Sequence, residues 1–307
     1  MDMNKMRSVI GKRLGWCAAW CVLLSAACTS VVLWNRVQPS GKVDRDVVYG
    51  RAAGEELRMD IYYPSNALTA HLPVVMYIHG GGWKLGGKYM LASMPGPEEL
   101  LRRGYLVVAI DYRLAPKYKF PAMLDDVKEA VRYLRANAPV YNLDTHHIGV
   151  MGDSAGGHLA ALLALTATNS EPGGEEDFSR VQAVVDLYGP TDFTTGDMHA
   201  DRTTIKLLKD VFGATGADDP VLKRASPVTY VTSNAPPFLI LHGDRDGMVD
   251  IKQSVELKTR LKAAGDDATF VTITNYAHGY TPLGRRSSPN NAELSKMVAD
   301  FFDRTLR

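Results

Sequence analysis

A strand, a tight turn and a helix are encoded side by side in residues 148–165. The apolar run Ile148–Met151 predicts a buried strand, and the uncharged run 155–165 predicts a helix. Between them lies the pattern G-x-S-x-G, centred on Ser154. Glycines two residues before and after the serine leave room for a bend that exposes its hydroxyl at the end of a sheet. The pattern therefore predicts a sheet that carries a nucleophile on a strand-to-helix turn.

A second glycine-rich segment follows an earlier apolar run. Residues 74–79 predict a strand that leads into the sequence H-G-G-G-W at 79–83. Ester hydrolysis passes through an intermediate with a negatively charged oxygen, which backbone N–H groups stabilise where no side chain blocks their approach. Together with the residue after the serine, we expect Gly81, Gly82 and Ala155 to form such an oxyanion hole. The alternative is a plain glycine-rich turn.

Two later strands end in the residue types that activate a serine. A serine nucleophile needs a base, and the base needs an orienting acid. The apolar run Pro237–Leu241 leads into H-G-D-R-D, and the alternating run Thr269–Ile273 leads into N-Y-A-H-G. In the chain order serine, acid, histidine, these segments predict Asp246 as the acid and His278 as the base.

Several neighbouring polar residues are expected to have structural roles. Asp244 and Asp250 remain rival acids, but turns after strands often carry aspartates that bind the backbone. His79 and His242 are expected to hold their loops by hydrogen bonds. His158, one turn into the helix after the serine, is interpreted as a packing residue.

These segments together resemble the hormone-sensitive-lipase-like branch of the α/β-hydrolases, especially its bacterial esterases. The resemblance covers roughly residues 45–305 and rests on H-G-G-G-W at 79–83, D-Y-R-L-A-P at 111–116 with F-P-A at 120–122, G-D-S-A-G-G at 152–157, H-G-D-R-D at 242–246 and H-G at 278–279. It implies a Ser154–His278–Asp246 triad, the oxyanion hole named above, no cofactor and no metal. The substrate that it implies is a small carboxylic ester.

The fold expected from this resemblance agrees with the apolar pattern of the chain. We expect an α/β-hydrolase fold, a mostly parallel eight-stranded sheet with helices on both faces and a small lid insertion. An antiparallel pair, Val47–Tyr49 and Leu57–Tyr63, opens the sheet, and six short apolar runs typical of buried parallel strands follow. Amphipathic helices are expected at 121–137, 254–264 and 292–306.

Domain organisation follows from these elements. Residues 46–307 are expected to form one catalytic domain. No strand pattern occurs between Pro190 and Pro227, and the resemblance implies the lid insertion there, at about 190–227, with helices around Thr203–Phe212.

The first 34 residues predict an export signal or a membrane anchor. Four basic residues precede the uncharged stretch Leu14–Trp34, and a polar linker at 35–45 follows. Three fates stay open: cleavage after small residues at 25–27, lipidation of Cys28, or retention as an anchor, since about 20 apolar residues span a bilayer. In each case the domain is expected outside the cytoplasmic membrane, as a periplasmic, membrane-anchored or secreted protein. All three cysteines lie in this stretch.

Other function classes find little support in the sequence. The formal net charge is +1 and the basic residues are spread out, so no nucleic-acid partner is expected. The segment Gly82–Lys88 matches a phosphate-binding loop, but Tyr89 stands where serine or threonine is needed. The pair His146-His147 lacks a third ligand at metal spacing.

The favoured function is therefore a serine hydrolase that cleaves short-chain carboxylic esters, with acetyl or feruloyl esters of carbohydrates as the natural target considered. Two alternatives remain. The same triad serves an arylformamidase or a peptidase, and a hydrolase scaffold serves some non-catalytic binding proteins. The sequence leaves the oligomeric state open.

Overall fold

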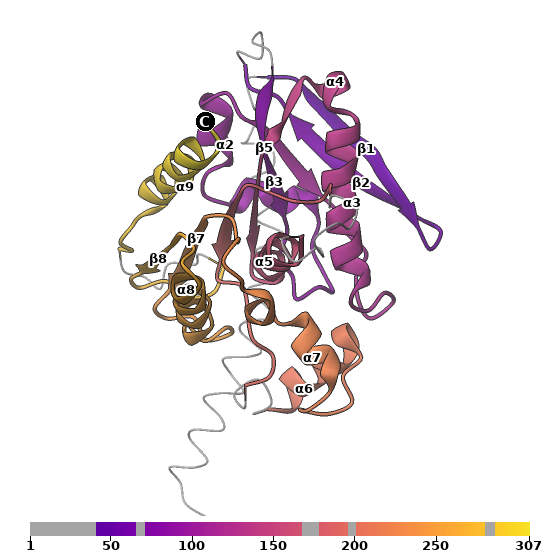
Figure 1. Ribbon diagram of the computed structural model, residues 1–307, viewed down its shortest axis with the longest axis vertical. Coiled ribbons are helices and arrows are strands. Elements are labelled where there is room, and N and C mark those ends of the chain that lie inside the picture. The colour runs from indigo at the N-terminus through magenta and orange to yellow at the C-terminus, as the bar shows by residue number, and fades with distance from the viewer. Residues whose placement is uncertain (1–40, 66–70, 168–177, 196–200, 280–285) are drawn as a thin grey trace, which may run out of the picture.

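A single mixed sheet forms the centre of the molecule. The computed structural model describes residues 41–65, 71–167, 178–195, 201–279 and 286–307 (Figure 1). In this part of the chain the sheet has eight strands in the order β1-β2-β4-β3-β5-β6-β7-β8. The strands are β1 (Val43–Ala52), β2 (Glu55–Tyr62), β3 (Leu72–Ile78), β4 (Leu106–Ile110), β5 (Leu143–Asp153), β6 (Ala183–Leu187), β7 (Phe238–Gly243) and β8 (Ala268–Ile273).

The pairing of the strands is mostly parallel. β1 pairs antiparallel with β2, and β2 pairs antiparallel with β4. All the remaining neighbours are parallel. Each strand predicted from the sequence overlaps one of these strands, and the expected α/β-hydrolase fold is confirmed.

Helices cover both faces of the sheet. One face packs against α3 (Ala122–Ala136), α5 (Ala155–Ala167) and α8 (Lys252–Ala264), and the other against α2 (Pro97–Arg102) and α9 (Asn291–Leu306). Successive residues of β3 alternate between the two cores, because side chains along a strand point to opposite faces. Burial on both faces explains why the central strands are continuous apolar runs, as in β4, where all five residues are buried.

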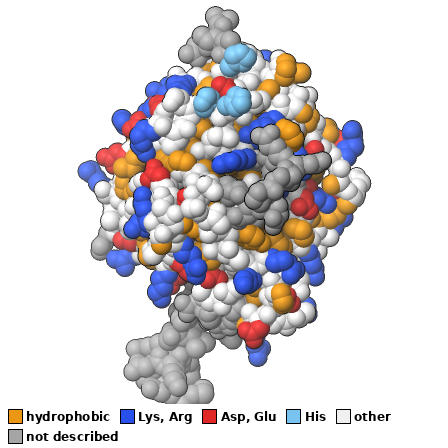
Figure 2. All heavy atoms as spheres, viewed as in Figure 1, with side chains coloured by type: hydrophobic (Ala, Val, Ile, Leu, Met, Phe, Trp, Pro, Cys, Tyr) orange, Lys and Arg blue, Asp and Glu red, His pale blue; other side chains and the backbone are white. Residues whose placement is uncertain are grey.

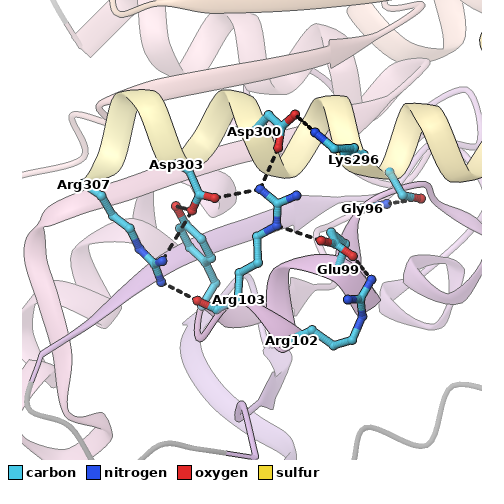
Figure 3. Close-up of polar contacts among 10 residues, drawn as sticks. Gly96, Glu99, Arg102, Arg103, Lys296, Asp300, Asp303 and Arg307 are labelled. Carbon is cyan, nitrogen blue, oxygen red and sulfur yellow. Dashed lines mark hydrogen bonds and ion pairs between the residues drawn. The ribbon is translucent and has the colours of Figure 1, made fainter.

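The C-terminal helix is fixed to α2 by a network of charged side chains (Figure 3). The Arg103 guanidinium binds Glu99 at 2.7 Å, Asp300 at 2.8 Å and Asp303 at 2.7 Å, and Asp303 also accepts a hydrogen bond from the Tyr105 hydroxyl. A shared arginine costs less side-chain entropy per contact than three separate pairs would. The network thus joins the two helices that cover the second face of the sheet.

The first strand begins earlier than the sequence indicates. The linker was expected to extend through residue 45, whereas β1 already starts at Val43 and pairs there with Tyr62. The charged residues 44–46 conceal this start, because an edge strand keeps such side chains in solvent. Asp46, at φ 54°, lies at an irregularity in the pairing with β2.

The predicted export signal or anchor at 1–34 lies outside the described residues, as does most of the linker. Among the residues that are described, no helix has both the length and the apolar character needed to cross a membrane.

The segment between β6 and β7 leaves the layered pattern. It contains α6 (Arg202–Phe212), α7 (Pro220–Ala225) and the 3-10 helix η3 (Pro227–Tyr230). Asp201 caps α6 by accepting hydrogen bonds from the backbone N–H groups of Thr203 and Thr204, and Gly213 ends the helix at φ 76°. We call α6, α7 and η3 the inserted helices. The remaining short helices are η1 (Lys88–Ser93) and α4 (Ala138–Tyr141).

Candidate active site

The serine lies on a strained turn between β5 and α5. Ser154 adopts φ 52°, a left-handed conformation that is unusual for a residue with a side chain. A Cβ atom at Gly152 would lie 2.3 Å from the carbonyl oxygen of Gly156, and one at Gly156 would lie 2.0 Å from that of Ile78. Glycine is therefore required at both positions, as the sequence pattern indicated.

Three side chains from separate segments meet at this turn. His278 Nε2 lies 2.8 Å from Ser154 Oγ, and His278 Nδ1 lies 2.7 Å from Asp246 Oδ2. Because a carboxylate only accepts, Nδ1–H donates to Asp246 and Nε2 accepts from the serine hydroxyl. The structure thus brings together the three residues predicted as nucleophile, base and acid.

The Asp246 carboxylate is buried and receives hydrogen bonds on both oxygens. Its Oδ1 accepts from the backbone N–H groups of Met248 at 2.8 Å and Val249 at 2.9 Å. Burial alone would raise the pKa of Asp246, but hydrogen bonds from His242 and His278 outweigh it and hold the pKa well below its ordinary value. The side chain of Asp246 is therefore ionised at neutral pH.

The two rival acids have other partners. Asp244 Oδ1 accepts from the backbone N–H of Asn275 at 2.7 Å, and Asp250 Oδ1 accepts from that of Lys252 at 2.9 Å. Both carboxylates shape their loops, which is the structural role expected for a carboxylate in a turn.

His242 holds the acid loop and also touches the acid. Its Nδ1 accepts from the Ser254 hydroxyl at 2.8 Å, and its Nε2 lies 3.1 Å from the Val249 carbonyl oxygen and 3.2 Å from Asp246 Oδ2. The loop-holding role was predicted. The contact with Asp246 was not predicted, because it depends on how the three residues between His242 and Asp246 turn.

The glycine-rich loop after β3 is fixed against the nucleophile turn. The Gly80 N–H and the Tyr77 hydroxyl both donate to Asp153 Oδ1, at 2.9 and 2.7 Å. Asp153 directly precedes the serine, so one buried carboxylate joins the two segments. Burial raises the pKa of Asp153, against the lowering effect of these hydrogen bonds. No sequence pattern predicted this role of Asp153.

The conformation of the loop favours close approach to a substrate. Gly81 and Gly82 have φ 108° and 60°, and the Gly81 carbonyl accepts from the N–H groups of Lys84 and Leu85. His79 stacks on Tyr112 at 4.2 Å between ring centroids, and the Tyr112 hydroxyl donates to the His79 carbonyl. These contacts fix the loop that carries two of the three predicted oxyanion donors. The third, Ala155, is the first residue of α5.

Metal ligands do not gather near this site or elsewhere in the described ranges, where no group of three histidine, cysteine, aspartate or glutamate side chains could hold an ion. His147 instead pairs with Asp144, three residues earlier. On the face shown in Figure 2, basic side chains are scattered with acidic ones among them rather than gathered in one patch.

The eight-stranded sheet and the hydrogen-bonded serine, histidine and aspartate define the class of this protein, the α/β-hydrolases with a serine triad. Within that class, the chain belongs to the BD-FAE family, whose family model matches residues 59–261.

Sequence and structure comparisons agree with this family. Esterase LipQ of Mycobacterium tuberculosis is 34% identical over 261 residues, which are 84% of this chain and 61% of LipQ. This chain therefore spans about three fifths of the length of that relative. A truncated carbohydrate esterase from gut microbiota aligns with a TM-score of 0.74 and 29% identity, covering 88% of this chain and 98% of the other. A bifunctional GH43-CE protein of Bacteroides eggerthii aligns with a TM-score of 0.73 and 31% identity, covering 86% and 38%.

Proposed function

We propose that this protein is a serine esterase that cleaves short-chain carboxylic esters through an acyl-enzyme intermediate. The observation that carries the proposal is the unbroken chain of hydrogen bonds from Ser154 through His278 to Asp246. Relatives named as esterases and carboxylic ester hydrolases support the reaction class.

The chemistry assigned to each residue follows from its position. His278 Nε2 takes the Ser154 hydroxyl proton as the serine oxygen attacks the ester carbonyl carbon. Backbone N–H groups of Gly81, Gly82 and Ala155 stabilise the oxygen that becomes negative. The imidazolium then gives the proton to the alcohol oxygen as the ester bond breaks, and the acyl group stays on Ser154. In the second half, Nε2 takes a proton from water as the water oxygen attacks the acyl carbon. The proton then returns to Ser154 Oγ, and the carboxylic acid is released.

Asp246 acts on the imidazole rather than on the substrate. Its carboxylate keeps the proton of His278 on Nδ1, so that Nε2 is free to accept from serine, and it stabilises the imidazolium that forms. The carboxylate is 1% exposed and the imidazole 10%, so water screens this interaction weakly.

We propose an acetylated or feruloylated carbohydrate as the natural substrate. The support comes from two structural relatives, one a carbohydrate esterase and the other a bifunctional GH43-CE protein. We favour a short acyl group because the H-G-G-G-W loop at 79–83 resembles that of esterases that act on small esters. The assignment to the hormone-sensitive-lipase-like branch rests on the sequence motifs and stays a prediction.

Hydrolysis of a series of nitrophenyl esters, from acetyl to palmitoyl, tests this function, together with acetylated and feruloylated xylan. We expect the highest kcat/KM for the shortest acyl groups and release of acetate or ferulate from the polysaccharide. Activity restricted to an aryl formamide or a peptide would move the protein to one of the alternative classes. A protein inert on every substrate and unreactive with a fluorophosphonate would be a binding protein on a hydrolase scaffold.

We also propose that the domain acts outside the cytoplasmic membrane, on the charge and hydropathy pattern of residues 1–34. Cell fractionation of the full chain, with N-terminal mass spectrometry, distinguishes the three fates. A Cys28→Ser variant that still partitions with the membrane would exclude lipidation at that residue as the anchor.

A further inference from the structure

A buried cluster of rings joins three segments that lie far apart in the sequence. Trp83 follows the glycines of the oxyanion loop, His158 lies on α5, and Phe212 ends α6. The Trp83 ring lies 5.1 Å from that of His158 and 5.2 Å from that of Phe212, both in edge-on geometry. Phe193 contacts all three rings, within 5.9 Å between centroids. The oxyanion loop, the nucleophile helix and the inserted helices therefore share one packed core.

His158 uses both ring nitrogens within this cluster. The indole Nε1–H of Trp83 donates to His158 Nδ1 at 3.1 Å, and His158 Nε2–H donates to the Ala225 carbonyl at 2.7 Å. An indole N–H can only donate and a carbonyl can only accept, so the imidazole is neutral with its proton on Nε2. His158 is fully buried, and burial lowers its pKa to about 4, which keeps the ring in this form at neutral pH.

The two partners of His158 belong to functionally different segments. Ala225 is the last residue of α7, one of the inserted helices, whereas Trp83 is bonded directly to Gly82 of the oxyanion loop. Trp83 has φ 58°, a left-handed conformation that costs a bulky residue about 1 kcal/mol or more. The hydrogen bond to His158 and the ring contacts hold the tryptophan in that conformation.

A second contact between the same two segments lies one residue further on. Lys84 Nζ binds Asp210 Oδ2 of α6 at 2.8 Å, with side chains 26% and 18% exposed. The inserted helices thus reach two successive residues of the loop, one by way of His158 and one directly.

We propose that His158 is a positioning residue that couples the inserted helices to the oxyanion loop, so that the N–H donor of Gly82 keeps its direction only while the inserted helices are seated. This inference rests on the esterase function proposed above. Loss of the Trp83 hydrogen bond should lower kcat, because donors aimed at the developing oxyanion act in the transition state and not in substrate binding. A residue that only packs would change stability and leave kcat unchanged.

Two substitutions separate the two arms of His158. In His158→Asn the side-chain oxygen stands near the place of Nδ1 and can accept from Trp83. In His158→Gln the amide nitrogen stands near the place of Nε2 and can donate to Ala225. We expect His158→Gln to lower kcat about tenfold to a hundredfold with KM little changed, which is less than the ~10²–10³-fold loss on removal of a whole oxyanion donor. We expect His158→Asn to lose less than His158→Gln.

The experiment measures kcat and KM of the full chain on an acetyl ester, and its thermal unfolding midpoint. It also measures the affinity for a boronic acid that mimics the tetrahedral intermediate. Boronate affinity should fall in parallel with kcat in His158→Gln. Trp83→Phe, which removes the donor, should lower kcat as well and add little when combined with His158→Gln. His147→Gln, at the far edge of the sheet, is the matched control and should match wild type.

Distinct outcomes overturn the two proposals. If the wild type neither hydrolyses esters nor reacts with a fluorophosphonate, the esterase function fails and this inference fails with it. If the wild type is active and both His158 variants lower only the unfolding temperature or only raise KM, the esterase function stands and the positioning role is wrong. Strictly additive effects of Trp83→Phe and His158→Gln would also contradict the coupling.

Discussion

Two histidine–aspartate pairs with the same Nδ1–Oδ2 distance lie at opposite ends of the parallel strands. His278 Nδ1 lies 2.7 Å from Asp246 Oδ2 at the carboxyl ends of the parallel strands, and His147 Nδ1 lies 2.7 Å from Asp144 Oδ2 near the start of β5. The first pair is 10% and 1% exposed, and the second is 43% and 25% exposed. The two pairs have the same residue types and the same distance, so these two properties do not distinguish the active site.

The surroundings of the two pairs differ instead. Asp144 and His147 are three residues apart and pair within one segment. They line a cavity of about 360 Å³ together with Arg103 and Arg307. These arginines bind acidic groups, so the cavity holds charges of both signs in contact with water. At the other end of the strands, His278 and Asp246 are 32 residues apart and shielded from water, and His278 also accepts a hydrogen bond from Ser154. A pair becomes functional where the fold buries it and supplies a third group.

The largest effect should come from removing the third group. Ser154→Ala should lower kcat by about 10⁶-fold, as loss of a triad nucleophile does, without moving the thermal unfolding midpoint by more than a few degrees. The steady-state rate on an acetyl ester and a melting curve check this. Residual activity within tenfold of wild type would show that another group attacks the ester.

The next substitution changes the acid at each edge in turn. Asp246→Asn should lower kcat by about 10⁴-fold, because an amide donates to Nδ1 and moves the imidazole proton to the wrong nitrogen. The matched change Asp144→Asn should leave kcat unaltered, since exposed pairs contribute about 0–1 kcal/mol and this one does not touch the site. Equal losses in the two variants would refute the comparison.

A smaller effect is expected from the glycines of the oxyanion loop. A Cβ atom at Gly81 would lie 2.2 Å from the Leu85 carbonyl oxygen, whereas one at Gly82 meets nothing within 4 Å. Gly81→Ala should therefore displace the loop and lower kcat by about 10²–10³-fold. Gly82→Ala adds only the cost of a left-handed alanine, about 1–2 kcal/mol, and should be milder. The measurement is kcat of both variants at a temperature where melting curves show both to be fully folded, and an equal or larger loss in Gly82→Ala would contradict this order.

Burial also gives the molecule a pH-dependent stability. His79 and His158 are fully buried, which lowers the pKa of each to about 4 from the ordinary 6.5. Between these values the unfolded chain binds protons that the folded chain does not, so stability is complete above pH 6.5 and falls as the pH drops toward 4. The slope is about 1.4 kcal/mol per pH unit for each histidine.

Buried carboxyls oppose this slope, because burial raises the pKa of Asp153 and Asp186. Burial raises the pKa of Asp186 to about 6, so below that pH the folded state takes up a proton there and gains stability relative to the unfolded chain. Both histidines lower the stability from pH 6.5 downward, whereas the gain at Asp186 begins only near pH 6, so denaturant unfolding should still show a net loss from pH 6.5 to 5. His158→Asn should flatten the curve, and an unchanged slope in that variant would contradict the assignment.

Local patterns were sufficient for most of the fold and part of the site. Strand-to-turn-to-helix patterning located Ser154 and the glycines, because their roles depend on backbone conformation within a few residues. The sequence favoured Asp246 as the acid but left Asp244 and Asp250 as rivals, since all three lie in one loop and its path decides which carboxylate meets His278.

Contacts between distant segments account for the rest. His158 was interpreted as a packing residue, and its ring does pack, but its hydrogen-bond partners are 75 and 67 residues away and neither carries a pattern that could be paired with it. Asp153 likewise contacts Gly80 only because parallel β3 and β5 are neighbours in the sheet. The early start of β1 was hidden by charges that an exposed edge strand tolerates.

Reaction of the full chain with a fluorophosphonate, followed by intact-mass and peptide mass spectrometry, tests the central claim most directly. The wild type and Asp144→Asn should each gain a single adduct on Ser154 at the same rate, Asp246→Asn should react far more slowly, and Ser154→Ala should gain none. An adduct on another residue, or no adduct on the wild type, would contradict a nucleophile activated by the buried pair.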